Sequence, residues 1–219
     1  MKKFVLFLIV LCGLSACKYK SLNEMLKEIA VQQVDTTGYS ERVVYPQSFT
    51  TVAVNCFSDV TYHQTALGEK PYVVLRAPEN VLQHTECIVV DDESLRIELK
   101  PPYRQPESVA FVINVYAPVV DRFVVNGGKC LRLGKIKRAM PLSVEMNGCG
   151  SILCDQLVAP DFEAELNGAG HIELRNIEVN RIKATINSIG NIVLSGKAKN
   201  TSLKINGEGK IDTNSLIKL

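Results

Sequence analysis

Apolar and polar residues alternate with a period of two along most of the chain, and in its second half this alternation recurs at a fixed interval. The markers of the interval are five asparagines separated by 21, 20, 20 and 19 residues: Asn126, Asn147, Asn167, Asn187 and Asn206. Apolar residues stand one and three positions before each asparagine and five and seven after it, with Thr213 the exception. Period-two alternation is typical of strands with one buried face. Residues 123–213 are therefore predicted to consist of five units of strand, tight corner and strand.

The regular period favours a stack of coils over a meander of hairpins. Asn-Gly is also a strong hairpin signal, so the corner alone does not decide between the two. Equivalent side chains that recur every 20 residues favour coils that stack in parallel register and share one core, because a single coil cannot bury its apolar face. The predicted fold is all-β: a right-handed, single-stranded parallel β-helix with coils of about 20 residues, preceded by antiparallel or irregular strands.

The residues that recur in every unit lie at its corner, which has the pattern Asn-Gly-x-Gly or a close variant. Glycine suits a corner that needs positive φ, and stacked asparagine side chains can hydrogen-bond from coil to coil. A glycine-rich phosphate loop would be followed by a helix, whereas here an alternating strand follows each time. We therefore predict a structural role for the corner residues, which are Asn126, Gly127, Asn147, Gly148, Gly150, Asn167, Gly168, Gly170, Asn187, Gly190, Asn206, Gly207 and Gly209.

The first half fits the same template less regularly. Val52 and Val54 precede Asn55, and Val60 and Tyr62 follow it, at the spacing of the later units, so Asn55 is expected to begin an early coil. Further strands are predicted at 72–76, 87–90, 94–100 and 108–116, with a solvated hairpin turn at 91–93. Residues 21–33 have apolar positions at helical spacing, which predicts a short amphipathic helix or a tether.

The N-terminus has the pattern of an exported protein. Two lysines precede an apolar run that is too short to span a bilayer, and small residues follow it. The segment 14–17 resembles a bacterial lipobox, which implies cleavage before Cys17 and acylation of its thiol. The expected organisation is a signal peptide at 1–16, a tether or short helix at 17–39 and a β-helix domain at 40–219. The expected location is the cell envelope, anchored by lipid to the outer membrane, with the surface and periplasmic faces both open.

Charge and cysteine content exclude several classes of ligand. Cleavage before Cys17 would leave 203 residues with 23 Lys and Arg and 23 Asp and Glu, because Lys2 and Lys3 leave with the leader. A net charge of zero gives no basic field for nucleic acid. Five further cysteines follow with no metal-ligand spacing to the three histidines, so no metal or cofactor is expected. Their redox state stays open between buried thiols and one disulfide: Cys56, Cys87, Cys130, Cys149 and Cys154.

No catalytic constellation is found in the sequence. A polysaccharide-cleaving β-helix would need convergent carboxylates, and the best aligned pair is Glu145 and Glu165, each two residues before an asparagine. In the same column the other units have Val124, Thr185 and Lys204. We interpret the two carboxylates as surface residues, so an enzyme is the third alternative.

The lipobox, the strand pair at 52–62, the 91–97 hairpin and the serial Asn-Gly-x-Gly units resemble the GIN-domain family of auto-transporter adhesin heads from Bacteroidetes-type bacteria. The resemblance covers residues 40–214 and implies a parallel β-helix in the cell envelope, with no functional residues to transfer. The lipid anchor, the zero net charge and the lack of catalytic residues favour a non-enzymatic binding or adhesion module, since the long faces of a solenoid suit a glycan or a protein ligand. The alternative is an assembly role, in which a second copy or residues 215–219 would cover the edge of the last coil.

Overall fold

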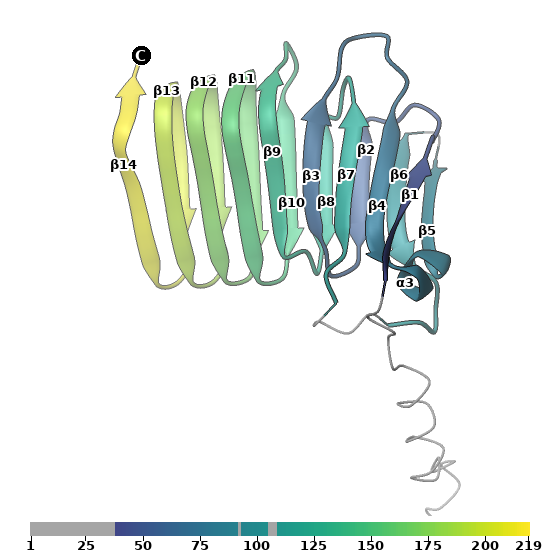
Figure 1. Cartoon of the computed structure of the whole chain (residues 1–219). Helices are drawn as coiled ribbons and strands as arrows, with labels where there is room; N and C mark the ends of the chain where they lie inside the picture. The colour runs from purple at the N-terminus through teal and green to yellow at the C-terminus, as the bar shows by residue number, and fades with distance from the viewer. Residues whose placement is uncertain (1–37, 92, 105–108) are drawn as a thin grey trace, which may run out of the picture. The chain divides into compact units, whose positions relative to one another are not determined.

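The computed structural model describes residues 38–91, 93–104 and 109–219, which form a parallel β-solenoid with antiparallel strands at one end (Figure 1). Consecutive coils are about 20 residues apart in register, as in the pairing of Leu142 with Phe162 and of Phe162 with Ile182. The predicted all-β solenoid with preceding antiparallel strands is thereby confirmed. The predicted signal peptide, the lipid site at Cys17 and nearly all of the predicted tether lie outside the described residues. Within the described part of the chain, no helix has the length and apolar character needed to cross a membrane.

The solenoid has two faces, each a row of strands that follows the axis of the stack. The first face contains β1 (Tyr39–Val44), β4 (Tyr72–Pro78), β7 (Val112–Ala117), β3 (Asp59–Gln64), β9 (Cys130–Lys137), the first parts of β11 (Gly150–Asn167), β12 (Gly170–Ile186) and β13 (Gly190–Ile205), and β14 (Gly209–Lys218). The second face contains β5 (Thr85–Val90), β6 (Ser94–Leu99), β2 (Thr51–Asn55), β8 (Arg122–Asn126), β10 (Leu142–Asn147) and the second parts of β11, β12 and β13.

The order of the coils along the axis differs from their order in the sequence at one point. The coil formed by β2 and β3 lies between the coil of β6 and β7 and the coil of β8 and β9. Between β7 and β8 the chain therefore passes over the β2–β3 coil, which precedes both strands in the sequence. The expectation that Asn55 begins an early coil is confirmed, since Asn55 is in register with Asn126 of β8.

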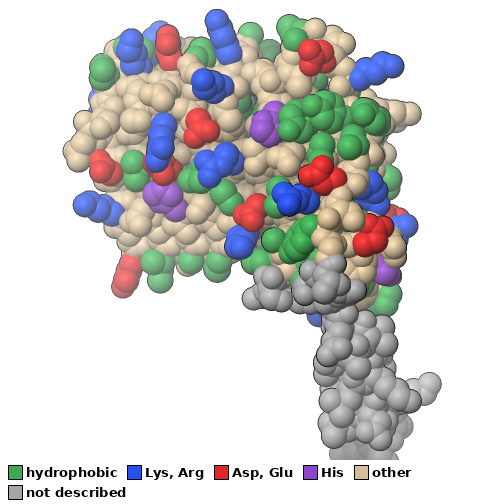
Figure 2. All heavy atoms as spheres, viewed as in Figure 1, with side chains coloured by type: hydrophobic (Ala, Val, Ile, Leu, Met, Phe, Trp, Pro, Cys, Tyr) green, Lys and Arg blue, Asp and Glu red, His purple; other side chains and the backbone are tan. Residues whose placement is uncertain are grey.

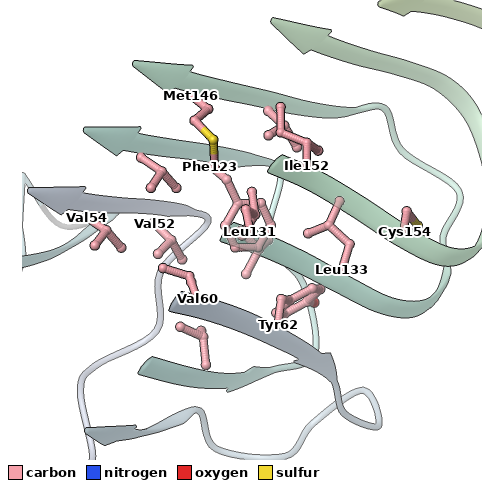
Figure 3. Packing of buried hydrophobic residues seen from close by; sticks show 14 of the residues in the cluster. Val52, Val54, Val60, Tyr62, Phe123, Leu131, Leu133, Met146, Ile152 and Cys154 are labelled. Carbon is pink, nitrogen blue, oxygen red and sulfur yellow. The ribbon is translucent and has the colours of Figure 1, made fainter. Parts of the chain in front are cut away.

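The core is the space between the two faces, filled by inward-facing apolar side chains, some of which Figure 3 shows. The apolar columns that flank each asparagine point into it. Phe123, Leu131, Ile152, Ile172 and Ile192 have no exposed surface. A fully buried side chain of this size contributes about 1.5–3 kcal/mol. Stacking of like residues on like residues thus accounts for most of the stability of the regular coils.

Antiparallel strands close the end of the stack next to β6 and β7. Here β1 and β4 extend the first face, and β5 extends the second through the hairpin predicted at 91–93. A short helix, α3 (Glu79–Gln83), joins β4 to β5 and buries Val81 and Leu82. The inward-facing Arg42 of β1 donates from its guanidinium to the carbonyl oxygens of Leu82 and Thr85, each at 2.8 Å. This helix was not predicted, because five residues are too few to show a helical period.

Candidate functional site

Four aromatic side chains form a row on the outer surface of the first face, which we call the aromatic row: His63, Tyr116, Tyr72 and Tyr45. The rings of His63 and Tyr116 stack at 4.4 Å between centroids and 11° between planes. Those of Tyr116 and Tyr72 stack at 4.4 Å and 7°, and Tyr45 lies 6.2 Å from Tyr72 at a tilt of 40°. Figure 2 shows hydrophobic side chains gathered beside a histidine on this surface.

Strand register explains how the row forms. The inward residues Val60 and Tyr62 place His63 on the outside of β3, and pairing brings it beside Tyr116 of β7 and then Tyr72 of β4. Cross-strand aromatic pairs of this kind contribute about 0.2–1 kcal/mol each. Packing does not explain Tyr45, whose side chain is 77% exposed. An exposed ring that continues a stacked row makes this surface a candidate binding site.

A groove lies at the Tyr45 end of the row. It has a volume of about 500 Å³ and is lined by Tyr45, Pro46, Gln47, Ser48, Lys70 and Pro71. The lining combines an aromatic face and two prolines with an amide, a hydroxyl and an ammonium group. These groups both donate and accept hydrogen bonds, so the groove suits a ligand with an apolar face and a polar rim.

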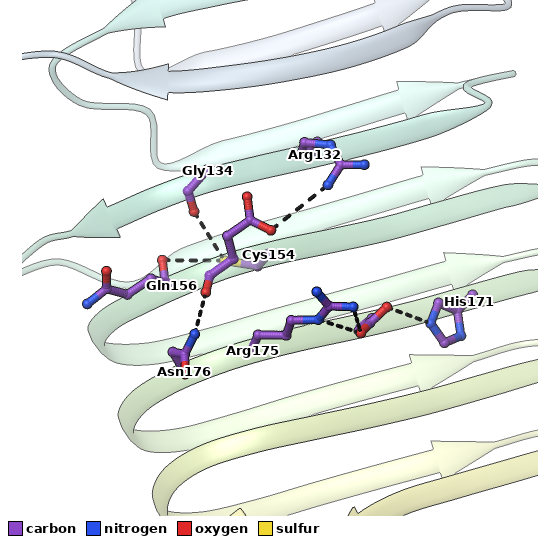
Figure 4. A network of polar contacts seen from close by, with 9 residues as sticks. Arg132, Gly134, Cys154, Gln156, His171, Arg175 and Asn176 are labelled. Atoms are coloured by element: carbon purple, nitrogen blue, oxygen red, sulfur yellow. Dashed lines mark hydrogen bonds and ion pairs between the residues drawn. The ribbon is translucent and has the colours of Figure 1, made fainter. Parts of the chain in front are cut away.

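The first face continues beyond the row as a surface of paired charges (Figure 4). Arg132 lies 3.9 Å from Asp155, and both side chains are about half exposed. Glu173 accepts a 2.6 Å hydrogen bond from Arg175 Nε and lies 3.3 Å from His171 Nε2. The hydrogen bond from Arg175 lowers the pKa of the Glu173 carboxyl below its usual value. A carboxylate held ionised in this way accepts hydrogen bonds but is a poor general acid.

The two carboxylates considered for catalysis lie side by side on the second face, Glu145 in β10 and Glu165 in β11. Each is engaged by neighbours. Glu145 forms a 2.8 Å salt bridge with Arg122 and accepts from Asn147 Nδ2 at 3.1 Å. Glu165 accepts from Asn187 Nδ2 at 2.8 Å. The two acids are neighbours because their coils are adjacent in the stack. Their partners are an arginine and asparagine amides of the same and neighbouring coils, which indicates a structural role at the surface.

The corner asparagines form a continuous hydrogen-bonded ladder along one edge of the stack. Each side-chain amide donates to the carboxamide oxygen of the preceding coil at 2.6–2.9 Å, from Asn206 through Asn187, Asn167, Asn147 and Asn126 to Asn55. Asn55 in turn donates to Glu98 of β6 at 3.2 Å, which ends the ladder. The terminal role of Glu98 had no signal in the repeat, since its unit lacks the asparagine.

The corner glycines serve two different physical needs. Gly127 has a φ of +77°, and Gly148 and Gly168 also have positive φ, which favours glycine. Gly150, Gly170, Gly190 and Gly209 are instead required by close stacking. A Cβ on Gly170 would lie 1.8 Å from the carbonyl oxygen of Gly150. Gly207 is of this second kind, because its Cβ would lie 2.1 Å from Ser188 O.

All five cysteines in the described part of the chain are free thiols. Burial raises the pKa of Cys56 and of Cys154 to about 12 and that of Cys87 to about 11. Cys130 is half-buried and Cys149 is exposed at a corner. The buried thiols behave as small apolar side chains, one of the two alternatives left open by the sequence. Within the described ranges, no three His, Cys, Asp or Glu side chains gather as metal ligands would.

With the geometry described, comparison with known proteins assigns a family. The sequence profile of the family described as "Putative auto-transporter adhesin, head GIN domain" matches residues 48–218. The chain belongs to this family. A family of adhesins indicates a protein of the cell envelope or surface. The sequence matches no protein in the curated set.

Two of the solved structures that resemble this chain illustrate the shared fold. One, titled a putative lipid binding protein from Parabacteroides distasonis ATCC 8503, superimposes with a TM-score of 0.69 over 82% of this chain and 75% of that one, at 17% identity. The other, titled a putative adhesin from Parabacteroides merdae ATCC 43184, gives 0.57 over 80% of each chain at 15% identity. At such identities the likeness shows the fold alone.

Sequence reasoning missed the aromatic row. Its signal was present, because His63, Tyr72 and Tyr116 occupy the outward phase of three alternating strands. Pairing between strands far apart in the sequence was needed to bring them together, and β4 runs antiparallel to β7. Tyr45 lies after β1 and had no periodic neighbour to indicate its position.

Proposed function

We propose that this GIN-domain protein is a non-enzymatic, lipid-anchored envelope protein that binds an external ligand through the aromatic row and the adjoining groove. The observation that carries the proposal is Tyr45, an exposed ring at the meeting point of the row and the groove. Exposed aromatic side chains are enriched at binding surfaces, where they contribute much of the affinity. The charge balance and the engaged state of Glu145 and Glu165 support binding over polysaccharide cleavage.

Binding is tested with the full-length protein in a detergent without sugar headgroups, applied to arrays of glycans, extracellular proteins and lipids. The double variant Tyr45→Ala/Tyr116→Ala should lose at least ten-fold in affinity for any ligand found. Tyr39→Ala is the matched control, since Tyr39 is also an outward tyrosine of this face, at the other end of β1. Equal binding by all three proteins, or binding of no ligand by the wild type, would contradict the proposal.

The anchor is tested separately from the ligand. Cys17→Ser should release the protein from the membrane fraction and abolish incorporation of labelled fatty acid. Protease treatment of intact cells, with a periplasmic protein as leakage control, then tests display. Digestion of this protein alone supports an outward-facing adhesin, and survival of both proteins places the binding face towards the periplasm.

A second role, self-association, is favoured by the last coil. Within the described residues, β14 pairs only with β13, and residues 215–218 continue β14 instead of folding over its edge. Ile211 is 41% exposed, whereas Ile192, its equivalent one coil earlier, is fully buried. Edge strands with apolar neighbours favour pairing with another chain. Sedimentation across a hundred-fold concentration range should show association that Ile211→Lys weakens, and a constant monomer mass would exclude it.

A further inference from the structure

The aromatic row follows a line across the strands of the first face, on which residues of neighbouring strands lie side by side. One position on this line has no side chain. Tyr72, Tyr116 and His63 occupy this line on β4, β7 and β3. The pairing of Tyr62 with Leu133 places Gly134 of β9 next after His63. The pairings of Leu133 with Cys154 and of Lys135 with Gln156 place Asp155 of β11 on the other side of the glycine.

The missing side chain leaves room for a flat ring. Neighbouring strands are about 4.8 Å apart, so the backbone positions of His63 and Asp155 are separated by two such spacings, about 10 Å, and the Asp155 carboxylate reaches back towards Arg132 of β9. Carbon atoms in contact are about 3.5–4 Å apart, so one ring above Gly134 would contact both neighbours. The imidazole stacks on Tyr116 with one face, and its opposite face is turned towards Gly134. The 3.3 Å contact between His63 Nε2 and Asn114 Oδ1 holds the ring in this orientation.

The polar groups around this position identify the chemistry of the ring. Asp155 supplies a carboxylate that accepts hydrogen bonds, and Arg132 supplies a guanidinium that donates them. Their separation of 3.9 Å is a loose ion pair between half-exposed side chains, which can turn to a ligand at little cost. Neighbouring hydroxyl groups donate and accept together, so they satisfy both groups. A purely aromatic ring has no hydroxyl groups to offer to the carboxylate and the guanidinium, whereas a sugar ring has several.

We propose that the ring of a neutral sugar binds above Gly134, stacked on His63 and hydrogen-bonded to Asp155 and Arg132, as one residue of a glycan that crosses the aromatic row. This assignment rests on the proposed function of the row as a binding surface and adds the class of its ligand. The span from Tyr72 to Asp155 covers four strand spacings, about 19 Å, which is long enough for several sugar units.

Histidine NMR signals report directly on this position, because the chain has only three histidines. His84 stacks on Tyr103 and His171 contacts Glu173, both away from Gly134, so their signals are internal controls. The full-length protein, in a detergent without sugar, is titrated with maltotetraose, cellotetraose, xylotetraose, mannotetraose and chitotetraose. At least one should shift the His63 signals saturably at concentrations up to on the order of 10 mM, while the other two histidines stay unchanged.

Two substitutions separate the sugar position from the rest of the face. Gly134→Val fills the position, and its Cβ would lie 3.4 Å from Tyr62 O, a contact that small shifts accommodate. Asp155→Ala removes the acceptor with no packing change. Each should weaken sugar binding at least ten-fold, and Asn191→Val, on the same face in β13, should leave it unchanged.

Three results overturn the assignment: no tested saccharide shifts His63, a saccharide binds but shifts only other residues, or Asp155→Ala and Gly134→Val bind as the wild type does. If Gly134→Val fails to fold, Asp155→Ala decides alone. A protein or lipid ligand on the arrays, lost in Tyr45→Ala/Tyr116→Ala but unaffected by Asp155→Ala, would leave the proposed function standing and exclude the sugar.

Discussion

The regular coils of β10 to β13 and the earlier coils of β2, β3, β6 and β7 share one backbone plan but differ in their outer surfaces. In the regular coils, outward side chains form ion pairs between neighbouring coils, as Arg181 does with Asp161 at 2.6 Å and Lys183 with Glu163. In the earlier coils the outward residues of the first face include the stacked rings of His63 and Tyr116, which Tyr72 of the adjoining β4 continues. Repetition thus builds the scaffold, and departure from repetition marks the candidate site.

The largest expected difference is between a corner glycine of the regular coils, Gly170, and Gly134 of β9 beside the aromatic row. Gly170→Ala would place a Cβ 1.8 Å from a carbonyl oxygen of the coil below, so the stack must open, at a cost of about 3 kcal/mol or more. Gly134→Ala meets its nearest atom at 3.4 Å and should cost less than about 1 kcal/mol. Urea unfolding followed by circular dichroism measures both. Equal costs would show that the coils do not stack as tightly as the structure indicates.

The asparagine ladder gives a smaller contrast. Asn167 accepts from Asn187 and donates to Asn147, and it is half-buried. Asn167→Ala removes both bonds and should destabilise the fold by about 1–2 kcal/mol. Asn55 also makes two such bonds, but it is exposed and one of them is a 3.2 Å bond to Glu98, so Asn55→Ala should cost about half as much. The same unfolding assay decides, and a larger loss at Asn55 would reverse the ranking of the regions.

The smallest expected effect is the pH dependence of stability that comes from buried thiols, and in this property the two regions should not differ. Burial raises the pKa of Cys56 in the early corner and of Cys154 in the regular coils to about 12 from 9.0. Above about pH 9 the unfolded chain loses these thiol protons while the folded protein keeps them, so stability falls as the pH rises from 9 towards 12. At pH 10 each thiol should account for about 1 kcal/mol of the loss.

The thiol contribution is measured by unfolding the wild type, Cys56→Ala and Cys154→Ala at pH 8 and pH 10. Each variant should lose less stability between the two pH values than the wild type does, because one titrating thiol has been removed. An unchanged pH dependence in either variant would mean that its thiol is open to water, and that region would then be the less tightly packed of the two.

The sequence predicted what depends on neighbours about 20 residues away and missed what depends on longer pairings. Ile152, Ile172 and Ile192 recur at the coil period, so their shared column could be inferred. The stacking of Tyr72 on Tyr116 depends on an antiparallel pairing that no period indicates. Glu98 ends the ladder only because β6 lies beside β2, and the position of Gly134 beside His63 needs the register between β3 and β9.

The insertion of the β2–β3 coil between two later coils has a consequence for synthesis. A ribosome releases residues 51–64 long before either neighbouring coil exists, and the hydrogen bond between Asn126 and Asn55 closes a separation of 71 residues. Regular coils pair after only about 20 residues. Long separations slow folding, because loop closure must precede the contact. The first coil to be translated therefore has both edges unpaired until β6 and β7 are made, and one edge unpaired until β8 and β9 follow, so a nascent chain interrupted before β9 would expose an edge to aggregation.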